Sequence, residues 1–395
     1  MKILIAEDDP VSMKLLQRTI VKWEHEVYTA EDGLKAWKMF QDVEFDIVIT
    51  DWMMPGIYGT ELCRKIREYA NERYIYTIIV TSKEEIADLV EGFEAGADDF
   101  LTKPFNKEEL KSRIDVGIRI LELENRLRNK NNLLEEANNK IIKDLEYAAR
   151  IQQSLLPNNL PNINGIEMCW KFFPCTQLGG DMLNVLRLDE NHYGIYMLDV
   201  SGHGAPSALF SVALSYLLTE RREILKTYTT HPPYYVLTSP KDVLESLNHQ
   251  FPMDLHAGQY FTILYGILDS LKLTFHWSNA GHPSLIAINE EGVKLFTEVG
   301  GPPIGFFKDS RYSEGFVKLK PKEKIILYSD GILEALNQAN QQFTIDRIIR
   351  ILKEEKTLKL KEIFPKLISE VQKWTSAKCG PNDDISLLGL EILET

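Results

Sequence analysis

Residues Lys107 to Leu156 read KEELKSRIDVGIRILELENRLRNKNNLLEEANNKIIKDLEYAARIQQSLL, the pattern of one long helix that joins two parts of the chain. Apolar residues return at every seventh position, at Ile120, Leu127, Leu134, Ile141, Ala148 and Leu155. A seven-residue repeat held this long favours a left-handed coiled coil. Since the other positions are mostly Glu, Lys, Asn and Arg, the apolar stripe has no core of its own to cover. We predict that it pairs with a second copy of itself, and a solitary helix lying on a neighbouring domain is the alternative.

The composition limits the classes of protein to which the chain can belong. Its 395 residues suffice for two or three domains that each bury a core. The net charge of -13 and the pI near 5.2 argue against nucleic-acid binding, because phosphate backbones select basic surfaces. The four cysteines lack paired C-x-x-C spacing, and no apolar run has the length of a signal peptide or a membrane span. We therefore expect a cytoplasmic protein that contacts neither nucleic acid nor a membrane.

The first 120 residues alternate short apolar runs with amphipathic helical patterns. This alternation predicts a doubly wound α/β domain, in which helices cover both faces of a parallel five-stranded sheet. The expected strands are residues 2–6, 27–30, 45–50, 75–81 and 99–101. Asp9 and Pro10 follow the first strand and have the types of a helix cap and a first-turn proline.

Polar residues follow the ends of these strands, which is where function gathers in parallel sheets. They include Glu7, Asp8, Asp51, Thr81 and Lys103. Clustered carboxylates in a cleft hold Mg²⁺ through oxygen. A carboxylate in such a place can attack phosphorus and form an acyl phosphate, while the metal and a lysine neutralise the equatorial oxygens.

Residues 1 to about 122 resemble the CheY-like receiver domain of two-component response regulators. The motifs that match in order and spacing are Ala6-Glu7-Asp8-Asp9-Pro10, Thr50-Asp51-Trp52-Met53-Met54-Pro55-Gly56, Val80-Thr81-Ser82 and Leu101-Thr102-Lys103-Pro104-Phe105. The resemblance implies that Asp51 accepts phosphate from a histidine kinase. It also implies that Asp8, Asp51 and the backbone carbonyl of Met53 hold Mg²⁺, with Glu7 in the outer shell of the ion.

The same resemblance assigns further roles. Thr81 and Lys103 would grip the phosphoryl oxygens, and Phe100 would be the aromatic side chain that repacks on activation. The Lys103–Pro104 peptide would be cis, a conformation found almost only before proline. Trp52, next to the acceptor, is bulkier than the residue that many members carry.

After Pro157 the pattern changes to longer strands, with apolar helices inserted between them. The expected strands are residues 166–173, 181–188, 193–199, 260–268, 273–279, 324–329 and 385–390. The expected helices lie near residues 207–219, 242–251, 345–355 and 360–374. This order predicts an α+β sandwich of two sheets flanked by helices. Residues 221–240 have only a weak pattern, and we expect them to form a mobile insertion near the functional site.

Four acidic motifs stand beside glycine or at strand ends in this part of the chain. They are Gly179-Gly180-Asp181, Asp199-Val200-Ser201-Gly202-His203-Gly204, Ser329-Asp330-Gly331 and Asn382-Asp383-Asp384. One such aspartate alone is usually a turn residue, but four together favour a site. Aspartates without cysteine ligands suit Mg²⁺ or Mn²⁺ better than zinc. Two such ions could share a hydroxide and hold a phosphate ester for in-line hydrolysis.

Residues from about 145 to 393 resemble the RsbU-like and SpoIIE-like branch of the metal-dependent PPM serine/threonine phosphatases. Further matching motifs are Ala149-Arg150-Ile151-Gln152-Gln153-Ser154-Leu155-Leu156-Pro157, Ser278-Asn279-Ala280-Gly281-His282-Pro283 and Gly300-Gly301-Pro302-Pro303-Ile304-Gly305. The resemblance implies that two Mn²⁺ or Mg²⁺ ions are bound by Asp181, Asp199 and the Val200 carbonyl, with Asp199 bridging both ions. Asp330 would complete the site together with Asp383 or the adjacent Asp384.

Three more residues bear on this site. Many members carry a second aspartate three residues after Asp181, where this chain has Asn184, and a ligand without charge would lower the metal affinity. His203 and His282 could be ligands or proton donors, but loop histidines held by hydrogen bonds to the backbone are commoner.

Together these patterns predict a receiver domain at residues 1–122, a helical linker at residues 107–156 and a PPM-type phosphatase domain at residues 157–395. The chain would be a homodimeric response regulator whose phosphorylation at Asp51 controls the phosphatase. The resemblance implies that the substrate is a phosphorylated STAS-type anti-sigma-factor antagonist. One alternative is an inactive phosphatase-like adaptor that only binds its partner. Another is that phosphorylation inhibits the output, because the sequence does not fix the sign of the control.

Overall fold

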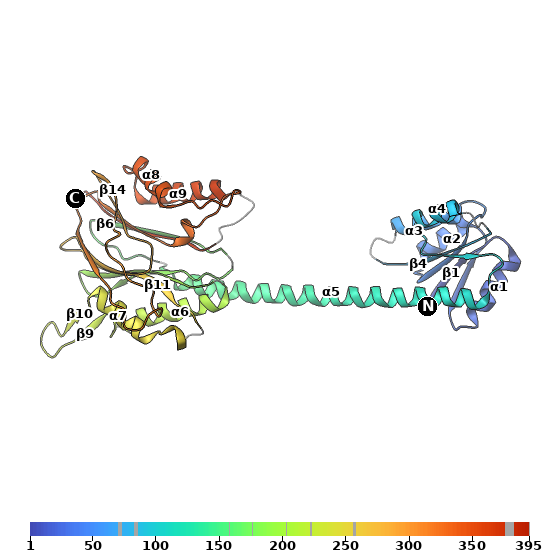
Figure 1. The fold of residues 1–395 in the computed structure, drawn as a ribbon, viewed down its shortest axis with the longest axis horizontal. Coiled ribbons are helices and arrows are strands. Elements are labelled where there is room, and N and C mark those ends of the chain that lie inside the picture. The colour runs from blue at the N-terminus through green and yellow to red at the C-terminus, as the bar shows by residue number, and fades with distance from the viewer. Residues whose placement is uncertain are drawn as a thin grey trace. The chain divides into compact units, whose positions relative to one another are not determined.

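The computed structural model describes residues 1–69, 73–82, 86–157, 159–175, 177–202, 204–221, 223–255, 258–375 and 383–394. The chain divides into two compact units, Met1–Asn139 and Lys140–Thr395. The division falls within one continuous helix, α5 (Lys107–Leu155), so each unit contains part of it (Figure 1). The structure therefore confirms the long helix predicted from Lys107 to Leu156.

Unit 1 is a five-stranded parallel sheet covered by helices on both faces, as predicted. The strand order is β2-β1-β3-β4-β5. The strands are β1 (Lys2–Ala6), β2 (Glu26–Ala30), β3 (Ile47–Asp51), β4 (Tyr76–Thr81) and β5 (Asp99–Thr102). The helices besides α5 are α1 (Pro10–Val21), α2 (Gly33–Asp42), α3 (Gly59–Tyr69) and α4 (Ile86–Glu94).

The sequence of unit 1 explains this arrangement. Strands that are covered on both faces need continuous apolar runs, and Ile3, Leu4 and Ile5 are all fully buried in β1. Asp9 caps α1 by accepting a hydrogen bond from the backbone N–H of Ser12 at 2.8 Å. The first helix therefore starts immediately beyond β1, and the residues between them face the carboxyl edge of the sheet.

Unit 2 is a sandwich of two antiparallel five-stranded sheets. The first sheet has the order β15-β12-β11-β8-β7 and the second β14-β13-β16-β17-β6. The first contains β7 (Met182–Arg187), β8 (His192–Val200), β11 (Phe261–Asp269), β12 (Thr274–Ala280) and β15 (Glu314–Lys318). The second contains β6 (Ile166–Phe173), β13 (Ile286–Asn289), β14 (Gly292–Leu295), β16 (Lys324–Tyr328) and β17 (Ile385–Ile392).

Helices cover the outer faces of both sheets in unit 2 (Figure 1). The first sheet is covered by α6 (Ala205–Glu220) and α7 (Pro240–Gln250), and the second by α8 (Ile345–Glu354) and α9 (Leu360–Thr375). Two short 3-10 helices, η1 (Met253–Leu255) and η2 (Asp330–Ile332), complete the unit. Apolar side chains from the inner faces of both sheets form the main core. The predicted two-sheet sandwich with flanking helices is thus confirmed.

Residues 221–240 differ from the expectation of an insertion near the site. They contain a β-hairpin made of β9 (Lys226–Tyr228) and β10 (Tyr235–Leu237). The Tyr235 hydroxyl donates to Asp189 at 3.0 Å, so the hairpin packs at the turn between β7 and β8. Asp181 precedes β7 and Asp199 is the second-last residue of β8, so both lie at the opposite end of this strand pair. The prediction that this segment borders the functional site was therefore wrong.

The middle of α5 exposes its apolar stripe. Leu127, Leu134 and Ile141 have exposed fractions of 56%, 67% and 57%. No helix among the residues that the structure describes is long and apolar enough to cross a membrane.

Candidate functional site

The carboxyl edge of the parallel sheet carries the first candidate site. Glu7 follows β1 and Asp51 ends β3, and one carboxylate oxygen from each lies within 4.8 Å of one from Asp8. The Lys103 ammonium lies 2.8 Å from both Glu7 and Asp51. The Lys103–Pro104 peptide is cis, as predicted. The structure thus brings Glu7, Asp8, Asp51 and Lys103 together.

The electrostatics of this cluster suit a bound cation. Burial, opposed by the hydrogen bond from Lys103 and reinforced by the charge of Asp51, raises the pKa of Glu7 to about 7. The Oε2 atom of Glu7 is buried and accepts no hydrogen bond, although it lies 2.8 Å from the Lys103 ammonium. A hard divalent cation with its coordinated water would balance these charges and satisfy that oxygen, so the residues fit Mg²⁺.

Two buried aromatic side chains lie close to this edge of the sheet. Phe100 in β5 and Trp52 are both buried, and their ring centroids are 6.4 Å apart. Trp52 belongs to a small core cluster with Cys63 and Phe100, so its bulk is accommodated inside the domain. Thr81 is buried at the end of β4, and its carbonyl accepts the Lys103 N–H at 2.8 Å. The side chain of Met53 is exposed.

The second candidate site forms at one end of the sandwich. The register of β7 with β8 pairs Met182 with Leu198, so the next pair outward is Asp181 and Asp199. Asp181 is buried, and Ser386 of the other sheet donates a hydrogen bond to its carboxylate at 2.6 Å. Burial, followed by the charges of Asp199 and Asp384, raises the pKa of Asp181 well above its ordinary value. The Asp181 carboxyl therefore lies close enough to Asp199 and Asp384 to respond to their charges.

Asp330, at the start of η2, belongs to the same group. Burial raises the pKa of Asp199 to about 8, and the charges of Asp330, Asp383 and Asp384 add to the effect. Burial, followed by the charges of Asp383 and Glu334, raises the pKa of Asp330 to about 6. The four predicted acidic motifs thus converge on one region.

Glycine permits the close approach of these loops. A Cβ atom at Gly180 would lie 2.9 Å from the Val200 carbonyl oxygen and 3.3 Å from a carboxylate oxygen of Asp199. A Cβ atom at Gly331 would lie 2.1 Å from the Asp384 carbonyl oxygen. Both distances to the carbonyls are too short for a side chain, so glycine is required where the acidic loops meet.

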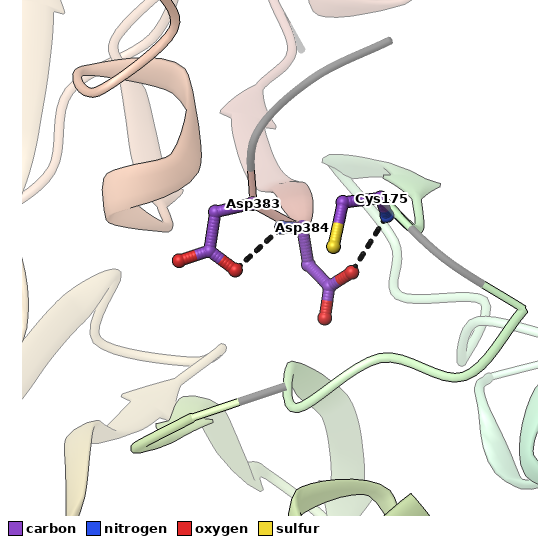
Figure 2. A group of neighbouring side chains, drawn as sticks. All are labelled: Cys175, Asp383 and Asp384. Carbon is purple, nitrogen blue, oxygen red and sulfur yellow. Dashed lines mark hydrogen bonds between the residues drawn. The ribbon is translucent and has the colours of Figure 1, made fainter. Parts of the chain in front are cut away.

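Figure 2 shows the two adjacent aspartates together with Cys175. The Asp384 carboxylate accepts the Cys175 N–H at 2.8 Å and the Gly180 N–H at 2.6 Å. Asp383 accepts the N–H of Asp384 at 2.8 Å, and its charge acts on Asp199 and Asp330. Both carboxylate oxygens of Asp384 thus hold backbone groups, while the charges of Asp383 and Asp384 both act on Asp199.

The donor set fits hard divalent cations. Carboxylate oxygens dominate it, and burial raises the pKa of the nearby Cys175 thiol to about 12, which keeps it protonated. Among residues whose positions are described, the one close group of three potential ligands in this unit is Cys175, Asp383 and Asp384, within 4.8 Å. Asp181, Asp199 and Asp330 are thus spread more widely than the ligands of a single small ion.

Three other predicted residues have different surroundings. Asn184 pairs with Tyr196, whose hydroxyl bonds Ser215 of α6, so Asn184 lies on the opposite face of the strand from Asp181. Asn184 therefore lies on the α6 side of the strand, and its effect on metal affinity stays a prediction. The buried His282 lies 2.8 Å from the Thr262 hydroxyl, and burial lowers its pKa to about 3. His203 lies outside the described residues.

A partly exposed group of aromatic residues, the Phe306 ledge, lies next to the loop that follows Asp199. We define it as Tyr260, Phe306 and Phe307. The Tyr260 N–H donates to the hydroxyl of Ser201, two residues beyond Asp199, at 3.1 Å. The rings of Tyr260 and Phe306 are 5.4 Å apart, and Phe306 and Phe307 have exposed fractions of 44% and 59%. The two phenylalanines line a hollow of about 620 Å³.

The comparisons with known proteins agree with this architecture. Residues 189–393 match the family described as Stage II sporulation protein E (SpoIIE), and residues 3–115 match the response regulator receiver domain. The chain belongs to the SpoIIE family. Its amino-terminal part is a response regulator receiver domain, so both predicted resemblances are confirmed.

Similar proteins are known from several bacteria. The phosphoserine phosphatase RsbP of Bacillus subtilis (strain 168) is 25% identical over 246 residues, which cover 62% of this chain and 57% of RsbP. The uncharacterized transcriptional regulatory protein YrkP of the same strain is 39% identical over 118 residues, 30% of this chain and 49% of YrkP. The chain thus spans about half the length of these curated relatives.

One solved structure shares the fold of the second unit. The SiaA-PP2C domain of Pseudomonas aeruginosa aligns with a TM-score of 0.53 and 22% identity, over 65% of this chain and 98% of that domain. The sandwich with flanking helices is thus the phosphatase fold of this family.

The sequence did not single out two residues that contact the acidic loops. Gln152 of α5 bonds Gly179, and Ser386 of β17 bonds Asp181. Gln152 stands within a motif that matches the family, and Ser386 follows the last acidic motif by two residues. Proximity to a motif was the available signal, but it does not show which neighbour a side chain contacts.

Proposed function

We propose that this chain is a response regulator whose output is a metal-dependent serine/threonine phosphoprotein phosphatase. The observation that carries the proposal is the convergence of Asp181, Asp199 and Asp330, whose pKa values are raised by burial and by neighbouring carboxylates. Ionised carboxylates that are buried close together cost free energy when no cation balances their charge. Acids with strongly shifted pKa values also mark functional sites. Membership of the SpoIIE family supports the same chemistry.

The phosphatase residues would act as follows. Asp181, Asp199, Asp330 and Asp383, with the Val200 carbonyl, would hold two divalent cations, and Asp199 would bridge them. Two Mn²⁺ or Mg²⁺ ions bound here would lower the pKa of a shared water and neutralise the phosphate. Ser386 would keep one oxygen of Asp181 fixed, and Asp384 would keep the Gly180 backbone in place. Without the cations, the carboxylates repel a phosphate ester.

In the receiver domain, carboxylates would also hold a divalent cation beside a phosphoryl group. Asp51 would be the phosphoacceptor, and its Oδ2 already lies 2.8 Å from the Lys103 ammonium. Mg²⁺ held by Asp8, Asp51 and the Met53 carbonyl, with Glu7 in its outer shell, would neutralise the phosphoryl oxygens. Thr81 and Lys103 would bind the remaining oxygens, and the kinase would be a histidine kinase.

A phosphoprotein is the substrate class that the surroundings of the site favour. The Phe306 ledge offers exposed aromatic area beside Asp199, which suits contact with a protein surface. RsbP, a similar protein, is a phosphoserine phosphatase by name. We therefore propose a phosphorylated STAS-type anti-sigma-factor antagonist as the substrate. Exposure of Leu127, Leu134 and Ile141 on a single chain supports homodimerisation through α5.

The alternative is an inactive adaptor, and Asn184 was the feature in its favour. Because Asn184 faces the side of the strand covered by α6, that argument loses its basis. Hydrolysis of an aryl phosphate by the full chain, with and without Mn²⁺, separates the two functions. We expect Mn²⁺-dependent turnover that Asp199→Ala abolishes and Asn184→Asp leaves unchanged. Absence of turnover in the unmodified protein at any Mn²⁺ concentration would favour the adaptor.

The direction of control requires its own measurement. Turnover is compared with and without an acyl-phosphate mimic that binds the receiver, in the unmodified chain and in Asp51→Asn. We expect the mimic to change turnover in the first protein and not in the second, and the sign of the change gives the direction. An equal response in both proteins would contradict control through Asp51.

A further inference from the structure

A buried histidine contacts the strand next to the one that carries Asp199. His282 is 5% exposed and follows β12, which pairs with β11. Its Nδ1 atom lies 2.8 Å from the hydroxyl oxygen of Thr262 in β11. Because burial lowers the pKa of His282 to about 3, the ring is neutral and has one donor and one acceptor nitrogen. The ring therefore acts on its neighbours through directed hydrogen bonds and carries no charge.

The turn that carries this ring is fixed. The Asn279 side chain accepts the His282 N–H and donates to the His282 carbonyl, both at 2.8 Å. Gly281 has a φ of 70°, and a Cβ atom there would lie 2.7 Å from the ring of Pro303, so only glycine fits between them. With its backbone held by Asn279 and its Nδ1 atom held by Thr262, the His282 ring has little freedom to turn.

Thr262 lies directly opposite a predicted metal ligand. The register of β11 with β8 pairs it with Asp199, and residues paired in this way project their side chains from the same face of a sheet. Asp181 takes the corresponding place on the other side of Asp199. Asp181, Asp199 and Thr262 thus form a row at the ends of three neighbouring strands. Thr262 and Asp199 are half-buried, whereas the residues before and after each of them in the strands are buried.

A hydroxyl in this row has hydrogen-bonding capacity beyond its contact with His282. Threonine offers one proton and two lone pairs, and one hydrogen bond to the ring uses only one of these. Divalent cations held by carboxylates keep coordinated water, and outer hydrogen-bond partners fix the orientation of the groups around a metal. The Thr262 hydroxyl stands beside Asp199, where such water would lie.

We propose that His282 is a positioning residue, which orients the Thr262 hydroxyl to bond a water molecule coordinated by the cations at Asp199. This inference rests on the proposed function and adds two residues to the same site. Thr262 makes the contact, and His282 fixes its direction. A substitution at His282 should therefore act on cation binding only while the hydroxyl of Thr262 is present.

The test compares two substitutions of Thr262 in the full chain. Thr262→Val keeps the shape of the side chain without its hydroxyl, and Thr262→Ser keeps the hydroxyl, so the second is the matched control. Mn²⁺ binding is measured by calorimetry. We expect Thr262→Val to weaken binding at least about tenfold, as loss of an outer partner of a metal site does. Thr262→Ser should bind nearly as the unmodified protein does. Equal affinity of the two variants would overturn the proposal.

A double-mutant cycle shows whether His282 acts through Thr262. We expect His282→Leu to weaken Mn²⁺ binding in the unmodified background and to add little in the Thr262→Val background, because residues that act as one unit are not additive. Fully additive losses would mean that His282 has an independent structural effect. Circular dichroism checks that each variant is folded.

A second readout needs neither a variant at Thr262 nor turnover. Histidine labelled with ¹⁵N reports the hydrogen bonding of each ring nitrogen, and the His282 signals are those that His282→Gln removes. We expect excess Mg²⁺ to shift the Nδ1 signal of His282 but not the signals of His276, which lies in β12 and contacts Glu314 at 3.2 Å. Unchanged His282 signals refute the proposal. If the protein binds Mg²⁺ but fails to hydrolyse phosphate, the proposed function fails while this shift still tests His282.

Discussion

The Asp384 carboxylate accepts the backbone N–H of Gly180 at 2.6 Å, across 204 residues of sequence. Its other oxygen accepts the Cys175 N–H at 2.8 Å. A carboxylate with both oxygens engaged by backbone groups holds loops together, and in this case it holds the loop that ends in Asp181. This contact gives Asp384 a structural role, and the charge of the adjacent Asp383 acts on Asp199 and Asp330. We therefore propose Asp383 as the ligand.

The two aspartates should therefore respond differently to replacement by asparagine. We expect Asp383→Asn to weaken Mn²⁺ binding with little change in the thermal stability of the metal-free protein. Asp384→Asn should lower the free energy of unfolding by about 1–3 kcal/mol, because a buried acceptor loses its match to two donors. Thermal unfolding in EDTA and calorimetric titration with Mn²⁺ measure the two effects. The opposite pattern would make Asp384 the ligand.

The raised pKa values predict how the stability of the metal-free protein depends on pH. Burial raises the pKa of Asp199 to about 8 and that of Asp330 to about 6, from 3.8. The folded protein therefore keeps protons that the unfolded chain releases. The resulting stabilisation is full below a pH of about 3.8 and is lost as the pH rises through about 8. We expect Tm in EDTA to fall between about pH 5 and pH 8.

Mn²⁺ should reverse this trend, because a cation replaces the protons on the same carboxylates. The increase in Tm caused by Mn²⁺ should grow with pH over the same range. Asp199→Asn removes the carboxyl with the pKa of about 8, so its Tm in EDTA should fall less steeply. A fall as steep as that of the unmodified protein would show that other groups cause the trend.

Dimerisation through α5 predicts the effect of a charge on its exposed stripe. Leu134 has an exposed fraction of 67% on a single chain. Leu134→Asp would remove one buried leucine from each chain of the dimer, which costs at least about 3 kcal/mol. The dissociation constant should rise roughly a hundredfold. Sedimentation velocity measures the change, with Asn132→Asp on the outer side of the helix as the control. A monomeric unmodified protein would contradict the coiled coil.

Patterns over many residues predicted the architecture well. The buried run Ile3-Leu4-Ile5 and the repeat along α5 depend on period and apolar content, which local sequence records. The short strands β13, β14 and β15 were missed, since four or five residues carry little periodicity. Residues 221–240 were expected near the functional site, and their β9–β10 hairpin was not predicted, because its position depends on the hydrogen bond from Tyr235 to Asp189 in another loop.

The acidic motifs were found because the residue types themselves show the chemistry. Two contacts could be found only from the structure. Asn184 sits three residues after Asp181, and only the contact of its strand partner Tyr196 with α6 shows that it faces away. Gln152 looks like any polar residue of a solvated helix, yet it is buried against Gly179. Spacing along the chain records neither contact.

The Phe306 ledge predicts a separation between protein and small-molecule substrates. If a phosphoprotein lies across the ledge while its phosphate reaches Asp199, Phe306→Ala should raise the KM for a phosphorylated STAS-type antagonist about tenfold, as loss of a contact worth about 1.4 kcal/mol does. The kcat/KM for an aryl phosphate, which is too small to reach the ledge, should stay the same. Phe316→Ala is the control, since Phe316 in β15 has an exposed fraction of 66% and lies outside the ledge. Equal losses for both substrates would mean that Phe306 supports the metal loops instead of binding the partner. No loss with either substrate would place the docking surface elsewhere on the sandwich.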